Sequence, residues 1–129
     1  MPFTVIIDRS PQFVRFRVAG PASLQNYFDL IEEAMRETQQ HRDTLGLVDL
    51  RGVAGRLKFT DQYFIGEVVG QKLKHLRKLA SLVASDPTSY NSETVANRTG
   101  VSLRIFDDEE KALAWLMQAD AMGPGSGPA

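Results

Sequence analysis

The residues best able to do chemistry gather just after a short apolar segment, residues 45–50, which reads LGLVDL. The group consists of Asp49, Arg51, Arg56, Lys58, Thr60 and Asp61. Gly52 and Gly55 allow a tight or left-handed backbone between them. This order predicts a buried strand, a basic loop at its carboxyl end and a helix beginning near Thr60, where open α/β sheets usually bind ligands.

The chemistry expected of this stretch is binding of an anion or of a charged partner. Thr60 or Asp61 can cap the helix, and helix N-termini favour anions, including a phosphate on a capping hydroxyl. Two interpretations remain open. Thr60 is either part of an anion site or phosphorylatable switch, or simply a cap, with Asp49 accepting hydrogen bonds from loop amides.

Groups arranged for catalysis are missing from the sequence. It contains no phosphate-binding loop, dinucleotide fingerprint, nucleophile elbow or paired zinc-binding histidines. The two histidines, His41 and His75, fall at predicted helix ends without a carboxylate at metal-ligand spacing, and there is no cysteine. We therefore expect a protein that is not an enzyme and holds neither metal nor cofactor.

The amino-acid composition and the net charge exclude some classes of binding partner. Hydrophobic residues make up 43% of the 129 residues and charged residues 24%, as in ordinary globular proteins. A formal net charge of −1 argues against nucleic acid as a partner. No apolar run approaches the roughly 20 residues that span a bilayer. The N-terminus lacks the basic region of a signal peptide, so we expect a cytoplasmic protein.

Hydrophobic periodicity predicts five strands and four helices. Alternating residues at 3–8 and 12–19 predict a hairpin, and the nearly continuous apolar runs at 45–50 and 79–85 predict buried strands. Residues 101–106 alternate again. Helical spacing covers residues 24–40 and 60–76, a short helix is expected between 91 and 96, and Asp107 with Glu110 resembles a capping box before the last helix.

The element order is therefore ββαβαβαβα, an α/β fold. Strand–helix–strand connections give parallel pairing, so strands two to five should form a parallel core with the first strand antiparallel. We expect one domain over residues 1–118. The tail at 119–129, rich in Gly, Pro and Ser, is expected to be disordered.

The runs LVDLRGV, LKFTDQYFIG, KLASLVAS and ANRTGVSLRIFDDEEKALAWL together resemble the bacterial STAS-like (SpoIIAA-like) proteins over residues 3–117. These proteins are related to the anti-sigma-factor antagonists and share a general shape with CRAL-TRIO lipid-binding domains. The resemblance implies a mostly parallel five-stranded sheet with four helices mainly on one face. It also implies a role in binding or regulation.

The resemblance also bears on Thr60. The antagonists carry an Asp-Ser or Ser-Ser pair at the start of the helix after the central strand, and that serine is phosphorylated. This chain has Phe59, Thr60, Asp61 and Gln62 there. Thr60 would stand in the place of the serine, and Asp61 would add a permanent negative charge beside it.

Three functional hypotheses follow. The leading one is binding of a protein partner through residues 51–61 and the helix after them. The alternative is a carrier of a small lipid-like ligand. Its apolar pocket would be lined by aromatic residues and by the apolar stripe of the same helix, namely Phe59, Tyr63, Phe64, Ile65, Val68, Val69 and Leu73. The third is a homodimer formed through the open part of the sheet or through the basic run at residues 72–78.

Overall fold

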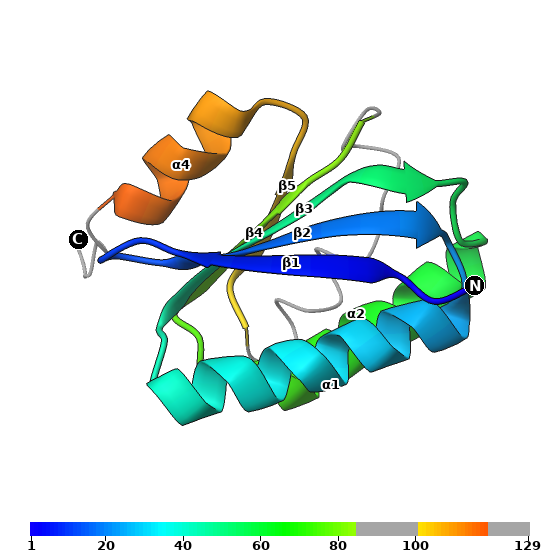
Figure 1. Cartoon of the computed structure of the whole chain (residues 1–129), viewed down its shortest axis with the longest axis horizontal. Helices are drawn as coiled ribbons and strands as arrows, with labels where there is room; N and C mark the ends of the chain where they lie inside the picture. The colour runs from blue at the N-terminus through cyan, green and yellow to red at the C-terminus, as the bar shows by residue number, and fades with distance from the viewer. Residues whose placement is uncertain (85–100, 119–129) are drawn as a thin grey trace.

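The computed structural model describes residues 1–84 and 101–118 of the chain (Figure 1). The short helix expected between 91 and 96 and the tail at 119–129 lie outside these residues. The described elements are β1 (Thr4–Arg9), β2 (Val14–Pro21), α1 (Leu24–His41), β3 (Leu45–Ala54), α2 (Phe59–Lys72), β4 (Lys78–Leu82), β5 (Leu103–Phe106) and α4 (Glu109–Met117). Three helices are thus described, where the sequence predicted four.

The five strands form one sheet in the order β1-β2-β3-β4-β5. β1 pairs antiparallel with β2, and the other pairs are parallel, which confirms the predicted pairing. The hairpin between β1 and β2 closes at Ser10, whose hydroxyl accepts hydrogen bonds from the amides of Gln12 and Phe13 at 3.3 and 3.1 Å. Because every strand lies beside its predecessor in sequence, β3 takes the centre of the sheet.

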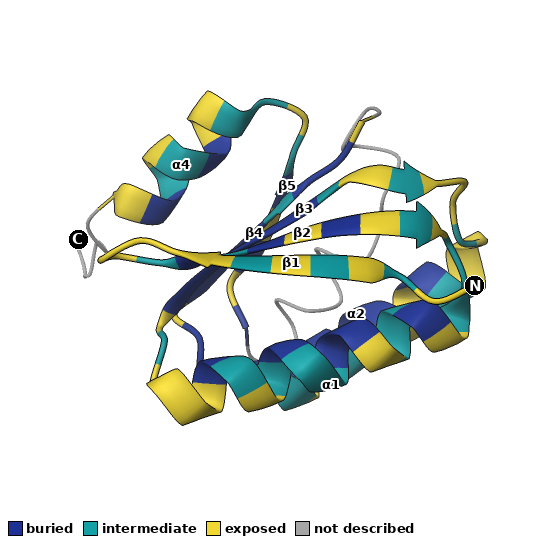
Figure 2. Cartoon of the chain, in the orientation of Figure 1, coloured by how far each residue is buried: buried dark blue, intermediate teal, exposed yellow. Residues whose placement is uncertain are grey.

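Helices cover both faces of the sheet. Of the three helices described, α1 and α2 lie together on one face and α4 lies on the other, which agrees with the prediction of helices mainly on one face (Figure 1). Figure 2 shows buried positions along the side of α1 and α2 that faces the sheet. The core beneath α4 is smaller and consists of Leu45, Leu47, Ala80, Leu82, Ala112 and Leu116.

β3 extends beyond its predicted end at Leu50 to Ala54. Arg17 pairs with Asp49 and Ala19 with Gly52, so the single residue Val18 of β2 lies opposite two residues of β3. Such a β-bulge bends the strand and redirects its side chains. Gly52 pairs with Ala19 in the ladder, and glycine suits this position because a Cβ there would lie 2.9 Å from the Val18 carbonyl oxygen.

The second helix ends earlier than predicted. The basic run at residues 72–78 is interrupted: Lys72 is the last helical residue and Lys78 is the first residue of β4. Lys78 is buried, and its Nζ donates hydrogen bonds to the carbonyl oxygens of Trp115 and Gln118 at 2.8 and 2.6 Å. Its charge therefore stabilises the carboxyl end of α4 instead of facing solvent. The N-cap of that helix is Asp108, one residue after the predicted Asp107.

None of the helices described is long and apolar enough to cross a membrane.

Replacing Leu116 by Ala tests the packing of α4 on the second face of the sheet. Leu116 is 1% exposed, so Leu116→Ala should lower the free energy of unfolding by about 2–5 kcal/mol in denaturant titrations. Met117→Ala is the matched control, because Met117 is 42% exposed and its loss should change stability by about 0.5 kcal/mol or less. Equal effects of the two variants would contradict the packing of α4.

Candidate functional site

The structure divides the six predicted site residues between two places. Asp49 and Arg51 point from β3 toward α4, on the same face as Leu45 and Leu47. The other four, Arg56, Lys58, Thr60 and Asp61, lie in the loop after β3 and in the first turn of α2. The two groups belong to opposite faces of the sheet and do not form one site.

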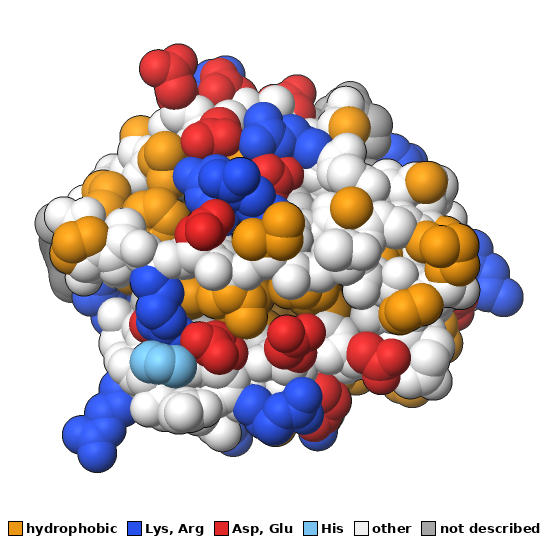
Figure 3. Space-filling model, in the orientation of Figure 1, with side chains coloured by type: hydrophobic (Ala, Val, Ile, Leu, Met, Phe, Trp, Pro, Cys, Tyr) orange, Lys and Arg blue, Asp and Glu red, His pale blue; other side chains and the backbone are white. Residues whose placement is uncertain are grey.

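Asp49 and Arg51 form an ion cluster with Arg15 and Glu109. The carboxylate of Asp49 accepts hydrogen bonds from Nε and Nη2 of Arg51, at 2.9 and 2.7 Å. Arg51 Nη2 also donates to Glu109 Oε1 at 3.0 Å, and Arg15 Nη2 donates to Glu109 Oε2 at 3.1 Å. The cluster ties β2 and β3 to the start of α4, and Figure 3 shows charged side chains gathered between α4 and β1.

Both carboxylates of this cluster have a lowered pKa. Hydrogen bonds from Arg51 lower the pKa of Asp49 despite its burial, and the hydrogen bond from Arg15 does the same for the pKa of Glu109. The bond to Asp49 raises the pKa of Arg51. Because general acids and bases need a pKa near the working pH, the cluster is suited to holding structure and not to proton transfer.

The amino terminus of α2 lacks the predicted cap. Lys58 is the N-cap residue, with an extended backbone and no side-chain hydrogen bond to the helix, so the prediction that Thr60 or Asp61 caps α2 is wrong. Thr60 is exposed at the second helical position. Gln62 is buried, and its Nε2 donates a 3.0 Å hydrogen bond to the Leu57 carbonyl, fixing the loop against the helix. Gly55 supplies the left-handed backbone that opens this loop, with φ of 82°.

The outer side of α2 carries aromatic residues in contact with solvent. Phe59 is 68% exposed, Tyr63 44% and Phe64 49%. Phe64 packs edge-on against Phe28 of α1, with ring centroids 5.8 Å apart. With Thr60 between them in the helix, these three aromatic residues are called the α2 patch below.

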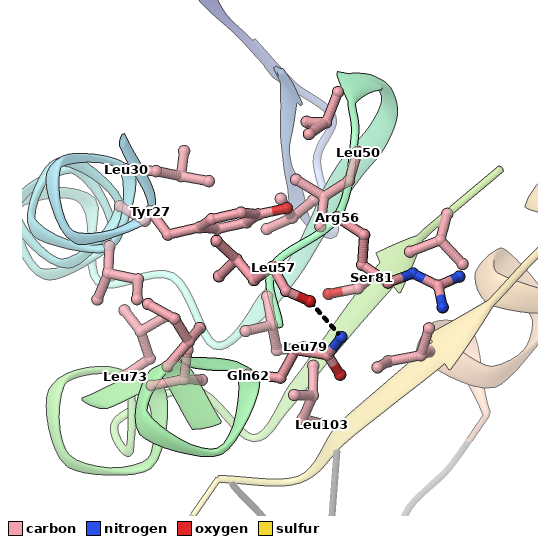
Figure 4. Close-up of a pocket in the computed structure, with 18 of the residues that line it drawn as sticks. Tyr27, Leu30, Leu50, Arg56, Leu57, Gln62, Leu73, Leu79, Ser81 and Leu103 are labelled. Atoms are coloured by element: carbon pink, nitrogen blue, oxygen red, sulfur yellow. Dashed lines mark hydrogen bonds between the residues drawn. The ribbon is translucent and has the colours of Figure 1, made fainter. Parts of the chain in front are cut away.

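A cavity of about 380 Å³ lies on the opposite side of α2, between α1, α2 and the sheet (Figure 4). Its described walls include Tyr27, Leu30, Ile31 and Ala34 of α1; Val48, Leu50 and Val53 of β3; Gly55, Arg56 and Leu57 of the loop; Gln62, Ile65, Val69 and Leu73 of α2; and Leu79, Ser81, Val83, Ala84, Leu103 and Ile105. Of the residues predicted to line an apolar pocket, Ile65, Val69 and Leu73 line this cavity, whereas Phe59, Tyr63, Phe64 and Val68 do not. Val68 is half-buried and packs against the core.

Sequence reasoning missed Arg15 and Glu109, and it found only the α2 wall of the cavity, through Ile65, Val69 and Leu73. Strand alternation carried a signal for Arg15, because Arg15 lies between Val14 and Phe16 and must face away from α1. Ser81 was a further signal for the cavity, since alternation places this polar residue on the same face of the strand as the apolar Leu79 and Val83. In the described part of the chain, no group of three or more acidic or histidine side chains could hold a metal ion.

The family follows from comparison with known proteins. A SpoIIAA-like family model matches residues 13–117. The chain belongs to the SpoIIAA-like family. No curated protein matches it closely enough to be counted as a relative.

Solved structures share the SpoIIAA-like fold. An uncharacterised SpoIIAA-like protein from Shewanella loihica has a TM-score of 0.56 and 19% identity, covering 89% of this chain and 93% of its own. An anti-sigma factor antagonist from Mycobacterium paratuberculosis has a TM-score of 0.55 and 13% identity, covering 90% and 95%. The antagonist SpoIIAA in its unphosphorylated form has a TM-score of 0.54 and 12% identity, covering 91% and 99%. At sequence identities this low, the similarity to these structures establishes the fold alone.

Replacing Asp49 by Asn tests the ion cluster through its pH dependence. The folded protein binds the Asp49 proton less tightly than the unfolded chain does, so the contact stabilises the protein above pH of about 4 and this stability is lost as the pH falls. At pH 7, Asp49→Asn should lower the free energy of unfolding by about 1–3 kcal/mol, and the difference should shrink toward pH 3.

Asp8→Asn is the control for this measurement. Asp8 is 51% exposed, and its carboxylate lies 3.4 Å from Arg17, so its loss should change stability little at any pH. Parallel pH profiles for the wild-type protein and Asp49→Asn would contradict a stabilising role of the cluster.

Proposed function

We propose that this SpoIIAA-like domain is a non-enzymatic regulator that binds a protein partner through the α2 patch and the neighbouring loop at residues 55–58. The observation that carries the proposal is that α2 is apolar on two sides. Ile65 and Val69 face the core, yet Phe59 and Tyr63 face solvent. A helix with one buried side has no need of aromatic residues on the other unless something else covers them.

The composition of the patch suits a protein interface. Aromatic side chains are enriched at the centres of interfaces, and Tyr is among the residues that contribute most binding energy. The rim is polar, with Lys58 and Thr60 exposed beside the aromatic rings. A basic rim of this kind complements acidic residues on a partner and speeds association.

The structural neighbours support a regulatory partner. Two of them are described as anti-sigma factor antagonists. Thr60 lies within the α2 patch with its side chain exposed near the helix amino terminus. A phosphate there would be favoured by the helix dipole, so modification would alter the binding surface without unfolding α2. We expect the protein to act in the cytoplasm. Asp49 and Arg51, which belong to the ion cluster near α4, are not part of the proposed binding surface.

Replacing two aromatic residues of the α2 patch tests the proposal. Immobilised wild-type protein should retain a partner from an extract of the source cells, identified by mass spectrometry. Phe59→Ser/Tyr63→Ser should reduce its retention about tenfold or more, because exposed interface aromatics commonly contribute about 1.4 kcal/mol or more of binding energy. The melting temperature should remain nearly unchanged.

Ile6→Ser/Met117→Ser is the matched control, since Ile6 and Met117 are also exposed, at 55% and 42%, but lie away from α2. This variant should retain the partner as the wild-type protein does. Equal retention by both variants would overturn the assignment of the surface. If the retained partner is a second copy of the chain, light scattering would show a dimer that the α2-patch variant abolishes.

A further inference from the structure

We propose that the cavity between α1, α2 and the sheet binds a single-chain carboxylic acid of medium length. The site is separate from the α2 patch, which lies on the opposite side of the same helix. Its ligand would place an alkyl chain among the apolar walls and a carboxylate beside Arg56 and Ser81.

The size of the cavity sets the length of the chain. A water-sized group occupies about 30 Å³ in a liquid, so 380 Å³ accommodates about ten to twelve carbon-sized groups. This is the volume of one alkyl chain of a medium-length acid. The two long chains of a membrane phospholipid need several times more space, so the structure favours a free acid over a phospholipid.

The walls explain why the chain would be apolar. Leu30 and Leu73 lie at one side of the cavity, on α1 and α2, and Leu79 and Leu103 lie on the strands (Figure 4). Specific ligand sites are mostly apolar, with a few polar groups that fix orientation. An alkyl chain bound here would make van der Waals contacts with these side chains, which they lack on the side that faces the cavity.

The polar residues explain why the other end would be a carboxylate. Ser81 faces the cavity between Val48 and Ile105 of the neighbouring strands, and its hydroxyl makes no hydrogen bond within the described residues. The Ser81 hydroxyl can donate a hydrogen bond to a ligand oxygen placed at this end of the cavity. Arg56 lines the cavity as well. Its guanidinium has five N–H donors and can hold a carboxylate in addition to the contact it makes within the chain.

Calorimetric titration with dodecanoate, below its micelle concentration, tests the proposal on the full-length protein. The wild-type protein should bind one molecule. Arg56→Gln should weaken dodecanoate binding about tenfold, as expected for a charged hydrogen bond, yet leave binding of 1-dodecanol nearly unchanged. Lys58→Gln is the matched control, because it removes a positive charge from the same loop at a position that does not line the cavity. It should leave both affinities unaltered.

A second pair of variants tests whether the chain enters the cavity. Ala34 and Ala112 are both buried helical alanines, but Ala34 lines the cavity and Ala112 lies in the closed core beneath α4. Ala34→Leu should fold with an unchanged or higher melting temperature and lose most dodecanoate binding. Ala112→Leu should melt at lower temperature, because its surroundings are full.

Four results of these experiments would count against the proposed ligand site. No dodecanoate binding by the wild-type protein, or unaltered binding by Ala34→Leu, would overturn the proposal. Equal losses for Arg56→Gln and Lys58→Gln would overturn the carboxylate site. Displacement of dodecanoate by phosphatidylcholine vesicles would point to a membrane lipid and contradict the free acid. Failure of these tests leaves the partner surface intact, since its own test uses the α2 patch.

Discussion

The contact between Asp49 and Arg51 is the interaction on which this part of the molecule depends. At the β-bulge one residue of β2 faces two of β3, so the backbone of β3 loses its regular ladder there. The Asp49 carboxylate accepts the backbone N–H of Arg51 at 3.1 Å as well as its guanidinium. This gives the Arg51 N–H a hydrogen-bond acceptor next to the bulge. The bulge then sets the direction in which β3 leaves the sheet, toward the loop and α2.

The central strand separates two unlike faces. Toward α4, Leu47 is fully buried in a small core, and the charged cluster closes the face beyond it. Toward α1 and α2, Val48 faces both the larger core and the cavity. Both proposed sites therefore lie on the second face and on α2, which has the cavity on one side and the exposed aromatic residues on the other. The proposed partner surface and the proposed ligand site share α2 and the loop residues Gly55, Arg56 and Leu57, but the aromatic residues of the α2 patch do not line the cavity.

Strand alternation and helical spacing were sufficient to predict the sheet, because each depends on neighbouring residues in the chain. These patterns gave wrong predictions where contacts between residues distant in the sequence determine the conformation. Lys78 looked like the end of a cationic helix, and it is a buried strand residue because its amine reaches carbonyls of α4. Gly52 looked like a loop residue, and it lies in β3, where it pairs with Ala19 of β2. The cavity was predictable only in part, since helical spacing tells that Ile65, Val69 and Leu73 face inward but not whether side chains fill the space beside them.

Methyl NMR of the leucine and valine residues, recorded with and without dodecanoate, tests most directly the claim that β3 divides a hollow face from a closed one. The account predicts shifts for Val48, Leu79 and Leu103, which line the cavity. It predicts none for Leu47 and Leu82, which lie on the opposite face of the same strands. Shifts of equal size on both faces, or none at Val48, would contradict it.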